Sequence, residues 1–219
     1  MKNIEKILVI VDMQNDFVEN RKINGADYKS ALPVQGSGEI IYNNKLLIET
    51  YSKKSNAAVV MTRDTHTLTD SSSIEEFNTY GNHCVKNTFG WQFIDEFSYK
   101  TFNIPRTKVV SPEKIMELTD FAAFEKNTTN IKVNSSAMKY FEYMLNQNPN
   151  TEVYIAGLVA GICVKDTFET LKGLGYKNLC IVSDATKGLT IEGKDLTNQD
   201  LEALQNNGAK LVSTLEALI

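Results

Sequence analysis

The chain has 219 residues and 42% of them are hydrophobic, which is enough apolar material for one sizeable core. Its 23 Lys and Arg against 27 Asp and Glu give a net charge of -4, so no basic excess exists to bind nucleic acid or an anionic membrane surface. No apolar run approaches the ~18 residues that cross a bilayer, and the 3 cysteines fit a reducing, cytoplasmic compartment better than a disulfide framework.

Short β-rich runs alternate with segments of helical spacing along the chain. In chain order, the sequence predicts a strand at Lys6–Asp12, a helix at Ser37–Lys53, a strand at Ala57–Thr62, weaker strands at Lys108–Val110 and Phe121–Phe124, a helix at Ser136–Asn146, a strand at Thr151–Ala156, a helix at Val164–Leu174, a strand at Asn178–Ser183, a helix at Asn198–Gln205 and a strand at Ala209–Val212. The stretch from Thr65 to Thr107 is poorly periodic, which is where functional loops tend to lie. We therefore expect a single domain over residues 1–219, with a doubly wound three-layer α/β/α fold and a mainly parallel sheet.

The unusual polar residues fall where predicted strands end. These residues are Asp12, Asp64, His66, Lys126 and Cys163. In an open α/β sheet, the ligand crevice lies beyond the carboxyl ends of the strands. Their shared placement therefore predicts a functional site at that edge of the sheet.

Cys163 lies in the segment GLVAGICV, between a predicted strand and a predicted helix. A thiol at a helix N-terminus experiences the positive end of the helix dipole, which lowers its pKa and favours the thiolate. Backbone N–H groups at such a turn are able to hold an oxyanion. A cysteine is more often a small buried hydrophobic residue, and that interpretation suits Cys180, inside an apolar run. The turn position favours a nucleophile at Cys163.

A cysteine nucleophile needs a base that takes its proton and returns it to a leaving amine. Histidine is the usual base, but the chain holds only His66 and His83, and both have a competing candidate role. Asp12 is the carboxylate that an apolar strand delivers to the crevice, although a strand-end cap is an alternative. Lys126 would lower the thiol pKa and stabilise the oxyanion, whereas an arbitrary lysine is usually a surface residue.

Asp64 and His66 lie on the same side of the chain if it is locally extended, because side chains alternate along a strand. With His83 they offer oxygen and nitrogen donors, a set that suits a catalytic or substrate-positioning divalent metal. The spacing is not that of a zinc finger, and Cys84 has no second cysteine nearby. From spacing alone, metal binding and an ordinary structural role both stay open.

Short motifs along nearly the whole chain resemble, in order, those of the isochorismatase-like cysteine hydrolases. They are DMQNDF at Asp12–Phe17, TRDTH at Thr62–His66, HCVKNTFG at His83–Gly90, FEKN at Phe124–Asn127 and GLVAGICV at Gly157–Val164. Asn87 stands where the family usually has glycine. The order and spacing of the motifs carry the resemblance, since each of them is weak alone.

The resemblance implies a catalytic triad of Asp12, Lys126 and Cys163. It also implies an oxyanion hole formed by the backbone N–H groups of Ala160 and Cys163, beside a non-proline cis peptide bond between Val159 and Ala160. Lys132 is a less favoured rival to Lys126, because the Phe-Glu of the motif does not precede it.

Nicotinamidases of this family hold a metal through an aspartate and two histidines, which map onto Asp64, His66 and His83. Some members add a glutamate, and Glu76 occupies its position. Phe17 matches an aromatic residue that flanks the nicotinamide ring, and Tyr80 stands where tryptophan is usual. The expected cofactor is a divalent metal, with zinc favoured and iron or manganese also compatible.

The resemblance therefore implies a cysteine amidohydrolase that converts nicotinamide, a small-molecule amide, to nicotinate and ammonia through a thioester. A true isochorismatase would cleave a vinyl ether without a cysteine nucleophile, so Cys163 counts against it. A family hydrolase of a ureido, carbamoyl or biuret-type amide would usually lack the metal set. A catalytically silent scaffold would hold an unreactive Cys163. Family members commonly form dimers or larger assemblies, so the sequence leaves a homo-oligomer open.

Overall fold

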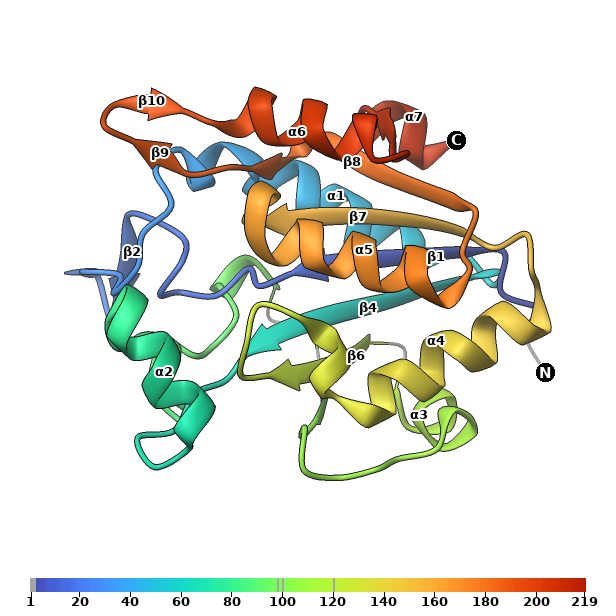
Figure 1. The fold of residues 1–219 in the computed structure, drawn as a ribbon, viewed down its shortest axis with the longest axis horizontal. Coiled ribbons are helices and arrows are strands. Elements are labelled where there is room, and N and C mark those ends of the chain that lie inside the picture. Colours follow the sequence, from blue (N-terminus) through green and yellow to red (C-terminus); the bar gives the residue numbers. More distant parts are fainter. Residues whose placement is uncertain (1–2, 98, 100, 120) are drawn as a thin grey trace.

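The computed structural model describes residues 3–97, 99, 101–119 and 121–219. In this part of the chain, strands form one 7-stranded sheet in which all the neighbouring strands run parallel (Figure 1). From edge to edge the strands are β11 (Lys210–Val212), β8 (Asn178–Lys187), β7 (Glu152–Leu158), β1 (Lys6–Val11), β4 (Ala57–Asp64), β6 (Phe121–Lys126) and β5 (Phe102–Ile104). Short antiparallel hairpins pair β2 (Arg21–Ile23) with β3 (Ala26–Tyr28) and β9 (Thr190–Ile191) with β10 (Lys194–Asp195).

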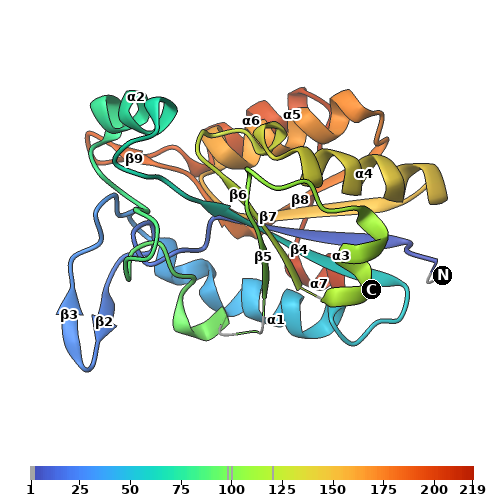
Figure 2. The same cartoon turned by 90° about the horizontal axis from the view of Figure 1, so that it is seen from below.

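Helices cover both faces of the sheet (Figure 2). One face is covered by α1 (Ile41–Tyr51) and α7 (Thr214–Leu218), and the other by α3 (Pro112–Leu118), α4 (Ser135–Gln147), α5 (Lys165–Leu174) and α6 (Thr197–Asn206). A further helix, α2 (Ser71–Tyr80), stands apart at the carboxyl end of the strands (Figure 1). The predicted three-layer α/β/α fold is confirmed. Among the described residues, none of the helices combines the length and the apolar character needed to span a bilayer.

The central strand β1 shows why both faces need a cover. Ile7, Val9 and Val11 lie in the hydrophobic cluster that contains α4 and α5, whereas Leu8 and Ile10 lie in the cluster that contains α1. All of them are fully buried. Successive side chains of a strand point to opposite faces, so a continuous apolar run is satisfied only between two layers of helices. This burial fixes β1 at the centre of the sheet, and it places Asp12, the residue after β1, at the carboxyl end of the strands.

Most of the predicted helices and strands are confirmed, with changes at their ends. The first predicted helix begins with a 3-10 turn, η1 (Ser37–Ile40), before α1. Similar short turns, η2 (Asp95–Phe97) and η3 (Ile131–Val133), lie in loops. A wider helical turn, η4 (Ala160–Val164), connects β7 to α5. The strands β4 and β8 continue beyond their predicted ends, to Asp64 and Lys187.

The prediction of a strand at Lys108–Val110 is wrong. A side chain, and not a neighbouring strand, forms hydrogen bonds with the backbone of this segment. The Val110 N–H donates to Ser136 Oγ at 2.9 Å, and this hydroxyl donates to Lys108 O, also at 2.9 Å. The α4 residue Ser136 therefore takes the place of a strand partner. The edge of the sheet is instead β5, which pairs with β6.

Candidate active site

Neighbouring strands bring the predicted catalytic residues to one edge of the sheet. Asp12 directly follows β1 with a left-handed backbone (φ 49°), and Asp64 is the last residue of β4. Lys126 is the last residue of β6, and Cys163 lies in η4, after β7. The strands β7, β1, β4 and β6 are consecutive in the sheet. Residues that are far apart in the sequence therefore meet at one place, as the position of the crevice in open α/β sheets requires.

Lys126 joins these side chains. Its side chain is fully buried, and Nζ forms an ion pair with Asp12 Oδ2 at 2.8 Å. Nζ also lies 3.4 Å from Asp64 Oδ1 and 3.5 Å from Cys163 Sγ, and it donates to Thr128 O at 3.1 Å. Burying charged groups is costly unless each has a partner. The ammonium and the two carboxylates therefore depend on one another.

Burial and charge together set the protonation states of this group. Burial alone would lower the pKa of Lys126, but Asp12 and Asp64 outweigh it and raise that pKa well above its ordinary value. Burial raises the pKa of Asp12, and Lys126 offsets only part of the rise. Burial would also raise the pKa of Asp64, but Lys126 and the neighbouring histidines bring it well below its usual range. The site holds a stable cation between two carboxylates, of which Asp12 is the stronger base.

The thiol of Cys163 does not have the lowered pKa that its position suggested. Burial raises the pKa of Cys163 well above its ordinary value, Lys126 offsets part of this rise, and Asp12 adds to it. Burial therefore opposes the resting thiolate that the turn position favoured. The residue is only 8% exposed, and desolvation of the thiolate outweighs the dipole of the short turn that precedes α5. With a raised pKa, Cys163 would need a base to act as a nucleophile.

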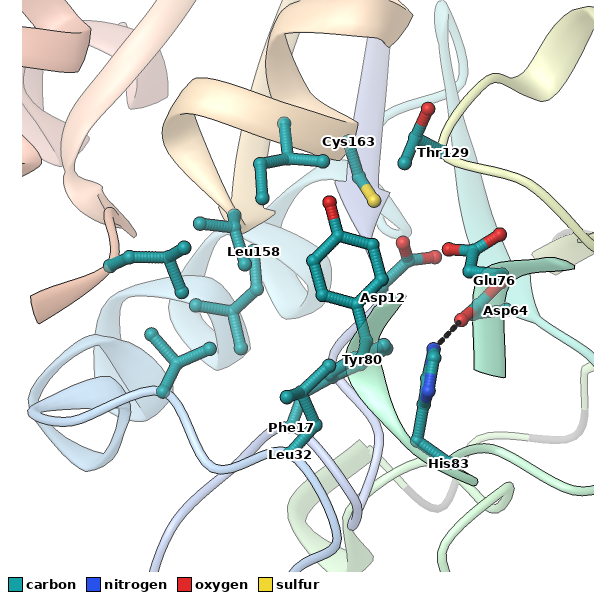
Figure 3. Close-up of a pocket in the computed structure, with 14 residues that line it drawn as sticks. Asp12, Phe17, Leu32, Asp64, Glu76, Tyr80, His83, Thr129, Leu158 and Cys163 are labelled. Atoms are coloured by element: carbon teal, nitrogen blue, oxygen red, sulfur yellow. Dashed lines mark ion pairs between the residues drawn. The ribbon is translucent and has the colours of Figure 1, made fainter. Parts of the chain in front are cut away.

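A second group of polar side chains shares the Asp64 carboxylate. Ligand atoms of Asp64, His66, Glu76 and His83 all lie within 4.8 Å of one another. Asp64 Oδ2 is 2.9 Å from His66 Nε2 and 3.2 Å from His83 Nε2, the second contact being the dashed line in Figure 3. Mostly buried nitrogen and oxygen donors of this kind match the ligands of divalent transition metals. The residues fit a metal site.

Hydrogen bonds orient the histidine rings of this cluster. His83 Nδ1 donates to Gly81 O at 2.8 Å, which leaves the lone pair of the neutral ring on Nε2. His66 Nδ1 lies 3.2 Å from the hydroxyl of Ser73, a buried residue of α2. Both Nε2 atoms therefore face the shared carboxylate. Metal-binding histidines are commonly held in this way by a contact to their other nitrogen.

A pocket that is partly open to solvent lies against both groups. Its polar side is formed by Asp12, Asp64, Glu76, His83 and Thr129, and its apolar side by Leu32, Val34, Leu158, Val159, Ile162 and Leu189 (Figure 3). Cys163, Phe17 and Tyr80 complete the lining, and the Tyr80 ring extends from the end of α2 into the pocket. Such a pocket suits a small, flat molecule with one polar end.

The structure corrects the position of the cis peptide bond. It joins Leu158 and Val159, not Val159 and Ala160. Because β7 ends at Leu158 and Ala160 already belongs to η4, the chain turns one residue earlier than the motif indicated. The rival lysine, Lys132, is exposed on η3, whereas Lys126 is buried in the site.

The sequence did not predict the apolar side of the pocket. Some of its residues, such as Val159 and Ile162, flank Cys163 in the chain, so proximity to the predicted nucleophile was a usable signal. Others, such as Leu32 and Leu189, come from loops whose positions only the fold defines. The Thr129 hydroxyl was also missed, and it donates to Asp166 of α5, which ties the loop after β6 to the helix that follows Cys163.

Comparisons with known proteins point to one family. A protein-family model described as the isochorismatase domain matches residues 6–216. The nicotinamidase of Schizosaccharomyces pombe is 27% identical over 235 residues, which cover 97% of this chain and 94% of the relative. The nicotinamidase of Saccharomyces cerevisiae is 26% identical over 94% of this chain and 99% of its own length. The crystal structure of Pyrococcus horikoshii pyrazinamidase in complex with zinc has a TM-score of 0.67 and 26% identity, covering 95% of this chain and 99% of that one.

Proposed function

Because the chain belongs to the isochorismatase family and is a hydrolase of that family, we propose that it is a cysteine amidohydrolase that converts nicotinamide to nicotinate and ammonia. The observation that carries this proposal is the position of Lys126 Nζ, 2.8 Å from Asp12 and 3.5 Å from Cys163. The nicotinamidases among the relatives support nicotinamide as the substrate.

Asp12 is the base of the proposed mechanism. The thiol of Cys163 is protonated at rest, and Asp12 takes its proton as the sulfur attacks the amide carbonyl. A bond forms between sulfur and carbon, and the carbonyl electron pair moves to the oxygen. The backbone N–H of Cys163 would donate to this oxyanion, and the Lys126 ammonium adds positive charge beside it.

The same carboxyl group completes the reaction. Protonated Asp12 gives its proton to the leaving nitrogen, the C–N bond breaks, and ammonia departs from a thioester on Cys163. Asp12, ionised again, then takes a proton from water as the water oxygen attacks the thioester. The C–S bond breaks, the sulfur regains its proton from Asp12, and nicotinic acid leaves and ionises to nicotinate by losing a proton to water. No proton is gained or lost by the protein over the cycle.

The metal would be held by Asp64, His66 and His83, with Glu76 as a further ligand. The zinc in the Pyrococcus horikoshii pyrazinamidase supports zinc, although iron and manganese accept the same donors. When bound, the metal supplies an electrophilic position for the pyridine nitrogen, directly or through water. Phe17 and Tyr80 would flank the ring, since both line the pocket.

The test is ammonia release from nicotinamide by the wild type, by Cys163→Ala and by Cys180→Ala. Cys180 is a matched control because it is equally buried, at 6% exposure, but lies in β8 away from the pocket lining. Turnover that is lost only in Cys163→Ala would support the proposal. No turnover in the wild type would refute nicotinamide as the substrate.

Alkylation by iodoacetamide separates the alternatives if turnover is absent. A single fast reaction at Cys163 would leave an amide hydrolase of another substrate, to be sought among ureido and carbamoyl amides. An unreactive Cys163 would identify a catalytically silent member of the family.

A further inference from the structure

The strands β1 and β4 separate just before the site. Their pairing ends at Ile10 and Met61. Beyond this point β4 stays paired with β6 on its other side, as far as Asp64 opposite Lys126. The last residues of β4 have therefore lost a strand neighbour on one edge, and buried backbone groups need a partner.

Side chains from the loop after β1 supply those partners. The side-chain amide of Gln14 accepts from the Asp64 N–H through Oε1, at 2.7 Å, and donates to Asp64 O through Nε2, at 2.9 Å. A glutamine side chain carries the same donor and acceptor as a peptide group. Gln14 thus takes the place of a strand partner at Asp64, where the main chain of β1 has turned away.

We infer that Gln14 is a positioning residue that sets the orientation of Asp64 in the site, an inference that rests on the metal site proposed above. Gln14 is fully buried and is absent from the pocket lining, so it would act through Asp64 rather than on the substrate. Its Nε2 also donates to Trp91 O at 2.9 Å, which ties the loop after His83 to the same amide.

The orientation of Asp64 matters because its two oxygens face different partners. Oδ1 lies 3.4 Å from Lys126 Nζ, and Oδ2 lies 2.9 Å from His66 Nε2. Gln14 on one side and β6 on the other fix the backbone of Asp64, and so fix the point from which its carboxylate reaches both partners. Ligand sites need their donors held to within about 0.5 Å, so the backbone tie at Gln14 favours metal binding.

The test is zinc affinity, measured by competition with a chromophoric chelator, in the wild type, Gln14→Met and Asn44→Leu. Asn44 is the matched control: it is also a fully buried amide whose Nδ2 donates to two carbonyl oxygens, those of Ile40 and Ala185, at 2.9 and 2.8 Å. Both replacements remove buried hydrogen bonds without adding charge. We expect the zinc Kd to rise about 10- to 100-fold in Gln14→Met and to stay unchanged in Asn44→Leu.

The outcomes separate this inference from the proposed function. Zinc binding that is unaffected by Gln14→Met, or weakened equally by both replacements, would overturn the inference and leave the metal site standing. A wild type that binds no zinc would overturn both. If Gln14→Met fails to fold, Gln14→Asn replaces it, because the shorter side chain keeps the amide but withdraws it from the Asp64 backbone, and the same rise in Kd is expected.

Discussion

Asp64 and Lys126 form an ion pair at the paired ends of β4 and β6, with 3.4 Å between Oδ1 and Nζ. Through this contact the carboxylate that faces the histidines also faces the cation beside Cys163. The proposed metal site and the proposed catalytic triad therefore share one ion pair, and a change in either should be felt in both.

Replacing Lys126 with Met leaves the carboxylates of Asp12 and Asp64 without their cation. Removing one partner of buried charged groups costs about 3–5 kcal/mol, so the free energy of unfolding should fall by about this amount at neutral pH. In the Lys126→Met protein, burial without a cation raises the pKa values of these carboxyl groups in the folded state above their values in the unfolded state. The groups therefore become protonated, and cost less to bury, as the pH falls. The difference in unfolding free energy from the wild type should thus shrink as the pH approaches the ordinary carboxyl range of about 4. Urea denaturation of the metal-free proteins at neutral and mildly acidic pH measures both effects.

Lys132→Met is the matched control for that replacement, since Lys132 is exposed on η3. It should change neither stability nor activity. A loss of stability in Lys126→Met that is equal at both pH values would contradict the charge argument.

The decrease in activity at low pH, the acid limb of the pH profile, should reflect protonation of Asp12. Burial raises the pKa of this carboxyl, and it serves as a base only when ionised. The value of kcat/KM for nicotinamide should therefore fall as the pH drops through a pKa above the ordinary aspartate value of about 3.9. Iodoacetamide alkylation of Cys163 in the metal-free protein should show the same limb, because it needs the base but not the metal ligands.

Asp12→Asn should abolish this limb in the alkylation profile and lower kcat by about 100- to 10,000-fold. A limb that persists in Asp12→Asn would assign it to another group.

Zinc should stabilise the folded protein. A ligand that binds only the folded state adds about 2.7 kcal/mol when present at 100 times its Kd, so the Tm should rise on adding zinc and fall with a chelator. His83→Ala removes the Nε2 donor and should abolish most of the shift. Glu76→Gln should reduce it less, since Glu76 is the least buried of the four residues. An equal Tm shift in wild type and His83→Ala would argue against the proposed ligands.

Tyr80 should contribute to substrate binding rather than to the chemical step. Its ring lines the pocket, and an aromatic contact is worth about 0.5–1.5 kcal/mol. Tyr80→Ala should therefore raise KM for nicotinamide by about 2- to 10-fold with little change in kcat. Tyr80→Trp should keep a low KM. Tyr42→Ala is the control, since this tyrosine is 72% exposed on α1. A fall in kcat alone in Tyr80→Ala would contradict the assignment of Tyr80 to substrate binding.

Much of the fold could be predicted from hydrophobic patterns. The apolar runs of β1, β4 and β7 are long enough to identify buried strands, and Gly175, with φ 105°, ends α5 as expected. The helix α2 could not be predicted, because its apolar residues are half-exposed, Ile74 at 45% and Tyr80 at 40%. Polar contacts hold it instead: Asp70 accepts from Ser72 N at its start and pairs with Arg106.

The candidate site could be located from motifs, and the family that they indicated is confirmed. The roles of the individual residues stay predictions. The position of the cis peptide bond was missed by one residue, and the upward direction of the Cys163 pKa shift was missed because burial cannot be seen from position in a motif. The role of Gln14 depends on the point where two strands separate, and no local pattern reports that point.

The order of the strands also affects how the chain emerges during synthesis. β1 lies between β4 and β7, and β7 comes late in the sequence. Until the ribosome has released β7, one edge of β1 offers unpaired backbone groups beside apolar side chains, which is the kind of edge that pairs with other chains. Pairing strands so distant in sequence is slow. The nascent protein is therefore most exposed to aggregation in the interval before β7 has left the ribosome.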